Sequence, residues 1–213
     1  MEVFTNNWNS HKYQIGYALS GGFIKGFAHL GVMQALLEHD IKPDIISGVS
    51  AGALAGVFYA DGNEPHKVLD YFSGHKFQDL TKLVIPKKGF FDLCEFIDFL
   101  HTNLKAKNLE ELQLPMIITA TDLDHGRMVH FHRGSIAERV AASCCMPVMF
   151  APVNIDGTNY VDGGLMMNLP VSTLRRIGDK VVAVNVSPIM AQDYKMNICL
   201  LYTSDAADER SSV

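Results

Sequence analysis

The chain has 213 residues, of which 48% are hydrophobic and 19% charged, and its formal net charge at pH 7 is −5. This length and composition predict one globular domain with enough apolar side chains for a full core. The acidic balance, with no basic run longer than Lys87-Lys88, argues against nucleic acid as a partner. The four cysteines show no metal-ligand or disulfide-framework spacing, so no metal site is predicted.

We expect the two ends of the sequence to lie outside the main domain. Residues 1–13 form a short polar segment without the apolar stretch of a signal peptide, and no window reaches the length of a membrane span. This favours a cytoplasmic protein. Residues 199–213 resemble a translated sequencing adapter, and we interpret them as a non-native tail. The main domain is then residues 14–198, with its natural C-terminal end expected to be missing.

A strand, a glycine-rich loop and a helix open the domain. Gln14–Leu19 is apolar enough for a buried strand, and apolar periodicity predicts a helix over Phe27–His39. The loop between them, Ser20–Gly26, can turn its backbone N–H groups toward an anion. Phe23 breaks the spacing of a dinucleotide-binding loop, so no cofactor is expected. Lys25 lies where a cation opposes the helix dipole, which favours an anion-facing or loop-bracing role.

The stretch Gly48-Val49-Ser50-Ala51-Gly52 is a G-x-S-x-G sequence between a short buried strand and a small-residue helix, Ala53–Ala60. Glycines on either side of the serine permit the strained turn that lifts the Ser50 hydroxyl out of the sheet. The helix N-terminus, beginning near Ala51, then favours a developing negative charge. The alternative is a glycine-rich turn that contains a serine by chance. A crossover helix implies parallel pairing, which brings both glycine turns to one edge of the sheet.

The middle of the chain is predicted to contain helices and one buried strand. A helix pair spans Asn63–Phe77 with a break at Gly74, a helix covers Phe90–Leu104, and a third buried strand covers Pro115–Thr121. The helix over Phe90–Leu104 carries an apolar stripe that is more typical of core than of lipid contact, formed by Leu93, Phe96, Ile97, Leu100 and Leu104.

A group of acids and histidines follows this strand. Asp122, Asp124, His125, His130 and His132 could be taken for a metal site, but their spacing matches no ligand set. We interpret His130 and His132 as alternating residues on a solvated strand face. Ser135 is expected to cap a helix that runs to Ser143, and Cys144 and Cys145 to be buried as small hydrophobic residues.

The last predicted elements are a hairpin, a helix and a strand. Asp156-Gly157 is a signal for a two-residue hairpin turn, and the returning strand ends in Asp162-Gly163-Gly164. We predict a helix that opens at Asn168-Leu-Pro170 and continues through Ile177. Lys180–Ser187 is a final apolar strand.

A serine nucleophile needs a base, which is usually a histidine held by an acid. All nine histidines precede Asp162, so the order Ser, acid, His of α/β-hydrolases cannot be completed in this sequence. A Ser50–Asp162 dyad fits better, in which the carboxylate takes the hydroxyl proton directly. Val161, Leu165 and Met166 are available to give this carboxylate an apolar setting.

Three motifs in this order resemble the patatin-like phospholipase (PNPLA-type) family: the Ser20–Gly26 loop, the Gly48–Gly52 elbow and the Asp162–Gly164 turn. The resemblance extends from Gln14 to about Pro188 and includes Thr121-Asp-Leu, Ser143-Cys-Cys-Met-Pro147 and Asn168-Leu-Pro170. It implies a three-layer α/β/α sandwich with a mainly parallel sheet. It also implies that lipid acyl esters are cleaved without a metal.

The resemblance assigns roles to individual residues. Ser50 is the nucleophile, Asp162 the general base, and N–H groups near Gly21, Gly22 and Phe23 form the oxyanion hole, with Lys25 at the family's basic position before Gly26. One departure is Phe23, which replaces a third glycine. We expect Phe23 to keep a backbone geometry open to any L-residue, because the neighbouring glycines can absorb the turn.

The expected partner is a lipid or another acyl ester, with transient contact to a membrane surface. Two alternatives remain open from the sequence. One is a non-catalytic lipid-binding or scaffold protein with the same fold. The other is a Ser-His-Asp esterase whose histidine lay beyond the present C-terminus. Nothing in the sequence indicates an oligomeric state.

Overall fold

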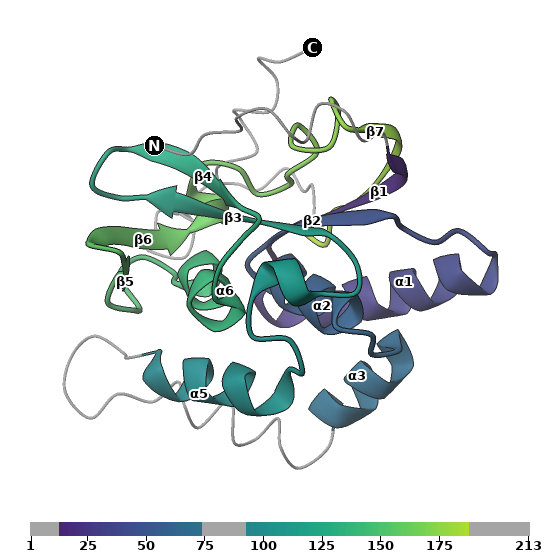
Figure 1. The fold of residues 1–213 in the computed structure, drawn as a ribbon, viewed down its shortest axis with the longest axis horizontal. Helices are drawn as coiled ribbons and strands as arrows, with labels where there is room; N and C mark the ends of the chain where they lie inside the picture. The colour runs from purple at the N-terminus through teal and green to yellow at the C-terminus, as the bar shows by residue number, and fades with distance from the viewer. Residues whose placement is uncertain (1–12, 74–92, 188–213) are drawn as a thin grey trace, which may run out of the picture.

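The computed structural model describes residues 13–73 and 93–187. Seven strands form one sheet in the order β5-β6-β3-β2-β1-β7, with β4 also pairing with β3 (Figure 1). The strands are β1 (Tyr13–Leu19), β2 (Ile45–Val49), β3 (Met116–Asp122), β4 (Arg127–Phe131), β5 (Val153–Ile155), β6 (Thr158–Asp162) and β7 (Gly178–Val184). The predicted N-terminal segment up to Lys12, the end of the helix pair beyond Ser73, Phe90, Phe91 and the tail 199–213 lie outside the described residues.

The four strands β7, β1, β2 and β3 are parallel, as the crossover argument predicted. In register, Leu19 of β1 pairs with Gly48 of β2 and with Val184 of β7. The carboxyl ends of these strands therefore lie at one edge of the sheet. The loop after β1 and the turn after β2 leave the sheet there, which is where open α/β sheets form their ligand sites.

The other half of the sheet is antiparallel, and its register explains the position of the candidate site. Strand β4 pairs with Ile118–Asp122 of β3 and so occupies one side of β3 over that whole span. Strands β2 and β6 must therefore share the other side. Val49, at the end of β2, pairs with Thr119, and Asp162, at the end of β6, pairs with the next residue, Ala120. The two strands approach from opposite directions and their ends meet on β3.

The α-helices of the described residues gather on one face of this sheet (Figure 1). They are α1 (Phe27–Glu38), α2 (Ala51–Ala60), α3 (Pro65–Ser73), α5 (Cys94–Asn103) and α6 (Ile136–Cys144), with short 3-10 helices η2 (Phe23–Gly26), η3 (Leu109–Glu111) and η4 (Gly163–Leu165). The main core packs Leu30, Met33 and Phe58 of these helices against strand residues such as Tyr17 and Ile118.

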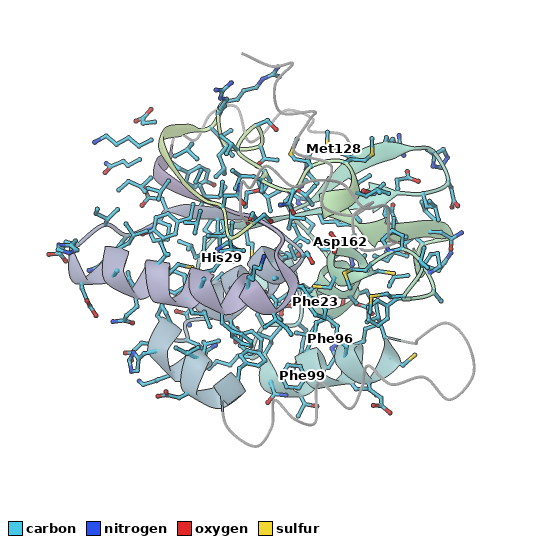
Figure 2. All side chains as sticks on the ribbon, turned by 180° about the vertical axis from the view of Figure 1, so that it is seen from behind. Phe23, His29, Phe96, Phe99, Met128 and Asp162 are labelled. Carbon is cyan, nitrogen blue, oxygen red and sulfur yellow. The ribbon has the colours of Figure 1, made fainter. Side chains whose placement is uncertain are left out.

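The apolar stripe on α5 belongs to this core. Leu100 is fully buried, and Phe96 and Phe99 pack against the core cluster. The ring of Phe99 lies 5.9 Å from that of Phe72 on α3, between centroids (Figure 2). The core interpretation of the stripe is confirmed for the described residues.

The opposite face of the sheet is covered by the segment between β6 and β7. Leu174 and Ile177 from this segment are buried against Ala18, Ile45 and Ile117. The helix predicted from Asn168 to Ile177 is wrong, because the segment forms turns rather than a regular helix. The hydroxyl of Thr173 donates to the Pro170 carbonyl at 2.6 Å, and Thr173 Oγ1 lies 2.8 Å from Ser47 Oγ. Such local side-chain bonds compete with regular helical bonding.

None of the helices in residues 13–73 and 93–187 is long and apolar enough to cross a bilayer. The described residues form an α/β domain whose central strands are parallel. The loops that follow β1, β2 and β6 converge on one place at the sheet.

Candidate active site

Ser50 lies on a sharp turn between β2 and α2, as the G-x-S-x-G spacing predicts. Its backbone angles are φ 52° and ψ −120°, in a region that non-glycine residues rarely adopt. Ser50 is the N-cap residue of α2, yet its side chain makes no capping hydrogen bond, so the hydroxyl is left for the site. Gly52 permits this turn, because a Cβ there would collide with the backbone of Leu19 and Ser20.

The strained turn is held from below by the hydroxyl of Ser143, on α6. The Ser50 N–H donates to Ser143 Oγ at 2.8 Å, and Ser143 Oγ donates to the Thr119 carbonyl at 2.7 Å. Ser143 and Thr119 are fully buried. One hydroxyl therefore ties the elbow to strand β3 next to the register position of Asp162. Sequence reasoning missed this residue, because the bond joins positions 93 apart in the chain.

Asp162 is fully buried at the end of β6. Its N–H donates to the Cys145 carbonyl at 2.7 Å, and its carboxylate Oδ1 accepts the Gly164 N–H at 2.7 Å. The other carboxylate oxygen, Oδ2, is buried as well. The turn can form only with Gly163, because a Cβ there would collide with the Thr119 carbonyl. Strand pairing places Asp162 on β3 next to the position of Val49, the residue that precedes Ser50.

Cys144 links the two residues. Its thiol is hydrogen-bonded to the Ser50 side chain, and the negative charge of Asp162 acts on the pKa of the same thiol. Burial, reinforced by that negative charge, raises the pKa of the Cys144 thiol well above its usual value. Burial likewise raises the pKa of Cys145, to about 12. The expectation that both cysteines are buried is met by Cys145, whereas Cys144 is half-buried and contacts the candidate nucleophile.

The glycine-rich loop differs from the expectation at two points. Phe23 has φ +51°, so the prediction that it keeps a conformation open to any L-residue is wrong. The side chain is 55% exposed, so the ring needs no space inside the loop. The Gly21 N–H donates to the Asn168 carbonyl at 3.0 Å, so it is not available as the expected oxyanion donor.

Other N–H groups around Ser50 remain suited to an anion. Within the described ranges, the Gly22 and Phe23 N–H groups have no protein acceptor. Ala51 opens α2, where the first N–H groups have no intrahelical partner. Gly26 lets this loop approach α2, because a Cβ there would lie 2.5 Å from the Ala51 Cβ. Lys25 is exposed on η2.

His29, on α1, braces this loop from inside the protein (Figure 2). It is fully buried, and its Nε2 lies 2.8 Å from the Ser20 carbonyl. Burial lowers the pKa of His29, so the ring is neutral and Nε2–H donates to that carbonyl. Ser20 Oγ in turn accepts the Val186 N–H at 3.0 Å. No local sequence pattern indicates this bracing role.

The acids and histidines after β3 form local pairs. Although burial acts to raise the pKa of Asp122, hydrogen bonds from His125 and Arg127 hold it below its usual value. His130 is half-buried, with Nδ1 at 2.9 Å from Thr119 Oγ1, so its expected position on a solvated face is wrong. In the part of the chain that the structure describes, no three such residues are placed to hold a metal.

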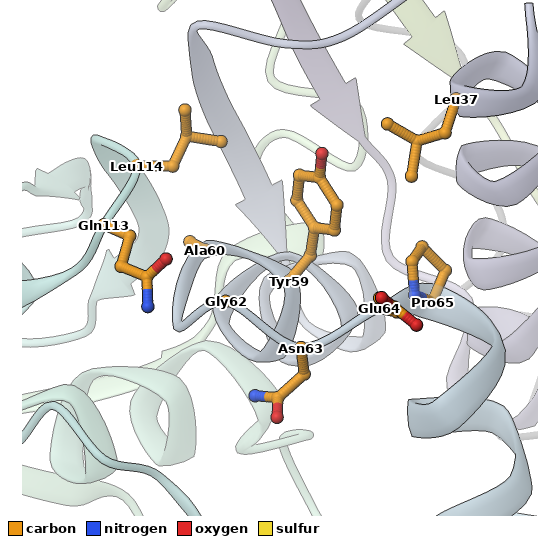
Figure 3. A pocket seen from close by; sticks show the side chains of 9 residues that line it. All are labelled: Leu37, Tyr59, Ala60, Gly62, Asn63, Glu64, Pro65, Gln113 and Leu114. Carbon is orange, nitrogen blue, oxygen red and sulfur yellow. The ribbon is translucent and has the colours of Figure 1, made fainter.

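A cavity of about 350 Å³ lies at the other end of α2 (Figure 3). It is lined by Leu37, Tyr59, Ala60, Gly62, Asn63, Glu64, Pro65, Gln113 and Leu114. Helix α2 has ten residues, which at 1.5 Å per residue places this cavity roughly 15 Å from Ser50. The cavity is therefore separate from the Ser50 site.

The chain was compared with known proteins. A family model described as patatin-like phospholipase matches residues 17–175. An uncharacterized NTE family protein of Mycobacterium tuberculosis is 31% identical over 183 residues, covering 82% of this chain and 49% of the relative. Lysophospholipase NTE1 of Cryptococcus neoformans is 32% identical over 184 residues, covering 83% of this chain and 11% of the relative.

Among solved structures, VipD from Legionella pneumophila matches with a TM-score of 0.59 and 17% identity, over 79% of this chain and 49% of that chain. This likeness shows the fold. The chain spans about half or less of the length of these relatives. The family match includes the glycine-rich loop, the elbow and the Asp162 turn. The chain therefore belongs to the patatin-like phospholipase family.

Proposed function

We propose that this protein is a serine acyl hydrolase that cleaves carboxyl esters of lipids, as a phospholipase A, lysophospholipase or esterase, with Ser50 as nucleophile and Asp162 as general base. The observation that carries the proposal is the meeting of β2 and β6 on one side of β3. It brings a serine on a strained elbow next to a buried carboxylate, with the N-terminus of α2 beside them. The family match and the lysophospholipase relative support the substrate class.

The mechanism has two steps. In the first, Ser50 Oγ attacks the ester carbonyl while Asp162 accepts the hydroxyl proton, and the alcohol leaves with a proton returned by Asp162. Asp162 Oδ1 accepts the Gly164 N–H, which orients the carboxylate for this proton transfer. In the second step, Asp162 takes a proton from a water that attacks the acyl carbonyl, and returns that proton to Ser50 Oγ as the bond to the serine breaks and the fatty acid leaves.

The negative charge that develops on the carbonyl oxygen needs preorganised donors. The N–H groups of Gly22, Phe23 and Ala51 fill this role in our proposal, in place of Gly21. An oxyanion hole needs donors about 2.7–3.1 Å from the developing charge, and loss of one typically costs about 10²–10³ in rate. The hydrogen bond from Gly21 to Asn168 holds the glycine-rich loop in its position.

The test is the release of fatty acid from lysophosphatidylcholine by the purified protein. We expect turnover by the parent, no turnover by Ser50→Ala, and parental turnover by Ser172→Ala, which removes an exposed serine far from the elbow in sequence. Equal turnover by parent and Ser50→Ala would reject the proposal. So would no turnover of this lipid or of p-nitrophenyl butyrate by well-folded parent protein.

A non-catalytic lipid-binding protein is the second candidate, and the left-handed backbone at Phe23 is the observation that favours it. We expect this conformation to be harmless to catalysis, because φ +51° is one that the family's glycine adopts freely. Phe23→Gly should change kcat by less than about tenfold, since loss of a whole oxyanion donor would cost more. A gain of a hundredfold would show that the natural site is impaired, and would favour the second candidate.

A further inference from the structure

Exposed apolar side chains are concentrated around the Ser50 site. The described residues contain seven exposed large hydrophobic side chains, and five of them lie on three loops beside Ser50. These five are Phe23 and Ile24 after β1, Val148 after α6, and Leu165 and Met166 after β6, and we call them the apolar rim. Val32 and Leu123 are the two that lie elsewhere. Single exposed apolar residues are common, whereas a group of them around a site indicates a binding surface.

The three loops are joined to one another. The Gly21 N–H donates to the Asn168 carbonyl, which connects the first loop to the third. The Asp162 N–H donates to the Cys145 carbonyl, which connects the third loop to the second. The Gly21 position also packs against the Ser50 side chain, since a Cβ there would lie 3.4 Å from the Ser50 Cβ. The rim residues are therefore carried on one bonded frame around the elbow.

Two rim residues are held outward by a costly backbone. Phe23 has φ +51° and Val148 has φ +73°, and left-handed geometry is strained for non-glycine residues, above all for β-branched ones. Their side chains are 55% and 70% exposed, so packing within the protein does not offset the strain. Strain of this kind is typical of functional sites.

The charges on these loops point to one kind of partner. Lys25 is the single charged residue among 20–26, 145–151 and 163–168, although the whole chain has a formal net charge of −5. An apolar surface with one cation and no acid complements a phospholipid surface, in which acyl chains lie beneath phosphate groups. A protein partner seated here would cover the opening to Ser50, whereas a lipid surface presents the ester to it.

We propose that the apolar rim inserts into the interface of a phospholipid bilayer or micelle and docks the Ser50 site on it. This rests on the proposed function for its purpose, but binding is measurable without catalysis. The rim side chains enter the headgroup and acyl boundary, and Lys25 lies at the level of the phosphates. The ester bond then reaches Ser50 without the lipid leaving the surface completely.

The test uses the full chain with Ser50→Ala, so that vesicles stay intact, and vesicles of equal parts phosphatidylcholine and phosphatidylglycerol. Cosedimentation is compared between Val148→Thr/Ile24→Ser and the matched control Val32→Thr/Leu123→Ser, which replaces the same kinds of exposed residues outside the rim. We expect the rim variant to bind at least about tenfold more weakly and the control to bind like the parent. Equal binding of rim variant and control would overturn the proposal.

Two further measurements separate this proposal from the proposed function. With Ser50 restored, the rim variant should hydrolyse p-nitrophenyl butyrate, a soluble ester, within a few-fold of the parent rate and lose activity on vesicles. If the parent cleaves no ester but the rim is needed for vesicle binding, docking stands and the proposed function falls. If lipid-free parent is a dimer in sedimentation and the rim variant a monomer, with equal vesicle binding, the rim is a self-association surface and the docking proposal falls.

Discussion

Two regions meet around Ser50, one with buried polar side chains and one with exposed apolar side chains. This reverses the usual distribution, in which apolar side chains are buried and polar ones exposed. Below it lies a buried polar frame of Ser20, His29, Thr119, Ser143 and Asp162, all fully buried. Around it lies the exposed apolar rim of Phe23, Ile24, Val148, Leu165 and Met166. Buried polar groups are stable only when hydrogen-bonded, so the frame fixes atomic positions. Much of the rim stays exposed, so its contribution depends on a partner.

Substitutions in the two regions should therefore have different effects. Changes in the polar frame should alter chemistry or stability and leave lipid binding intact. Changes in the rim should alter lipid binding and leave the hydrolysis of soluble esters intact.

Asp162→Asn should have the largest effect. The amide keeps the shape and can still accept the Gly164 N–H, but it has no basicity. Hydrolysis of p-nitrophenyl butyrate should fall by about 10²–10⁴-fold, the usual contribution of a general base. Vesicle cosedimentation should be unchanged, because the rim is intact. Activity within a few-fold of the parent would mean that another group is the base, including the histidine of a Ser-His-Asp arrangement.

Ser143→Ala should reduce kcat by about 10–100-fold, because the strained elbow loses its support and small displacements of a nucleophile are costly. The Ser50 N–H loses its acceptor, which should lower the free energy of unfolding by about 1–3 kcal/mol. Ser143→Cys should recover part of the activity, since a thiol is a weak donor and acceptor.

Thr173→Val is the matched control for Ser143→Ala. It removes another buried hydroxyl, on the opposite face of the sheet, that bonds to Ser47 and Pro170. We expect it to lower stability but to keep kcat within a few-fold of the parent. Equal kcat losses in both variants would show that Ser143 acts through general stability rather than through the elbow.

His29 should make the fold sensitive to acid. Burial lowers its pKa, so below about pH 6.5 the unfolded chain binds a proton that the folded protein excludes. Stability therefore falls as pH decreases, by at most about 1.4 kcal/mol per pH unit for this group. His29→Gln, which retains a donor for Ser20, should reduce this slope in denaturant titrations between pH 7 and pH 5. An unchanged slope would assign the acid sensitivity elsewhere, first to His130, whose pKa burial also lowers.

Val148→Gly should have the smallest effect and the opposite sign. Glycine adopts φ +73° without strain, so the free energy of unfolding should rise by about 0.5–1 kcal/mol. The same change at Val32, inside α1, should lower it by a similar amount, because glycine is a poor helix former. Thermal denaturation distinguishes the two directions. Loss of stability in Val148→Gly would show that the rim is packed rather than exposed.

Sequence patterns correctly predicted the features of the site that depend only on residues close together in the chain. The G-x-S-x-G turn and the Asp156-Gly157 hairpin are built by residues near in sequence, and both formed where expected. Parallel pairing then brought the Ser50 turn and the glycine loop to one edge. Phe23 was misjudged because its outward side chain and its neighbours, rather than its intrinsic preference, decide its backbone conformation.

Long-range contacts account for what sequence reasoning missed. Ser143 supports an elbow 93 positions earlier, and Gly21 donates to Asn168, so neither bond leaves a periodic signal. The helix expected at Asn168–Ile177 did not form, because Leu174 and Ile177 are buried against the sheet and Thr173 bonds to the strand beneath it. Tertiary contacts determine the conformation at these positions. They also determine most of the hydrogen bonds in the polar frame.

The most direct test of the central claim is covalent labelling of the purified protein with an alkyl fluorophosphonate, followed by peptide mass spectrometry. We expect one label per chain, on the peptide that contains Ser50, with no label on Ser50→Ala. It also predicts labelling of Asp162→Asn that is slower by about the same 10²–10⁴-fold as its hydrolysis. A label on a different residue, or no label on folded parent protein, would contradict the account.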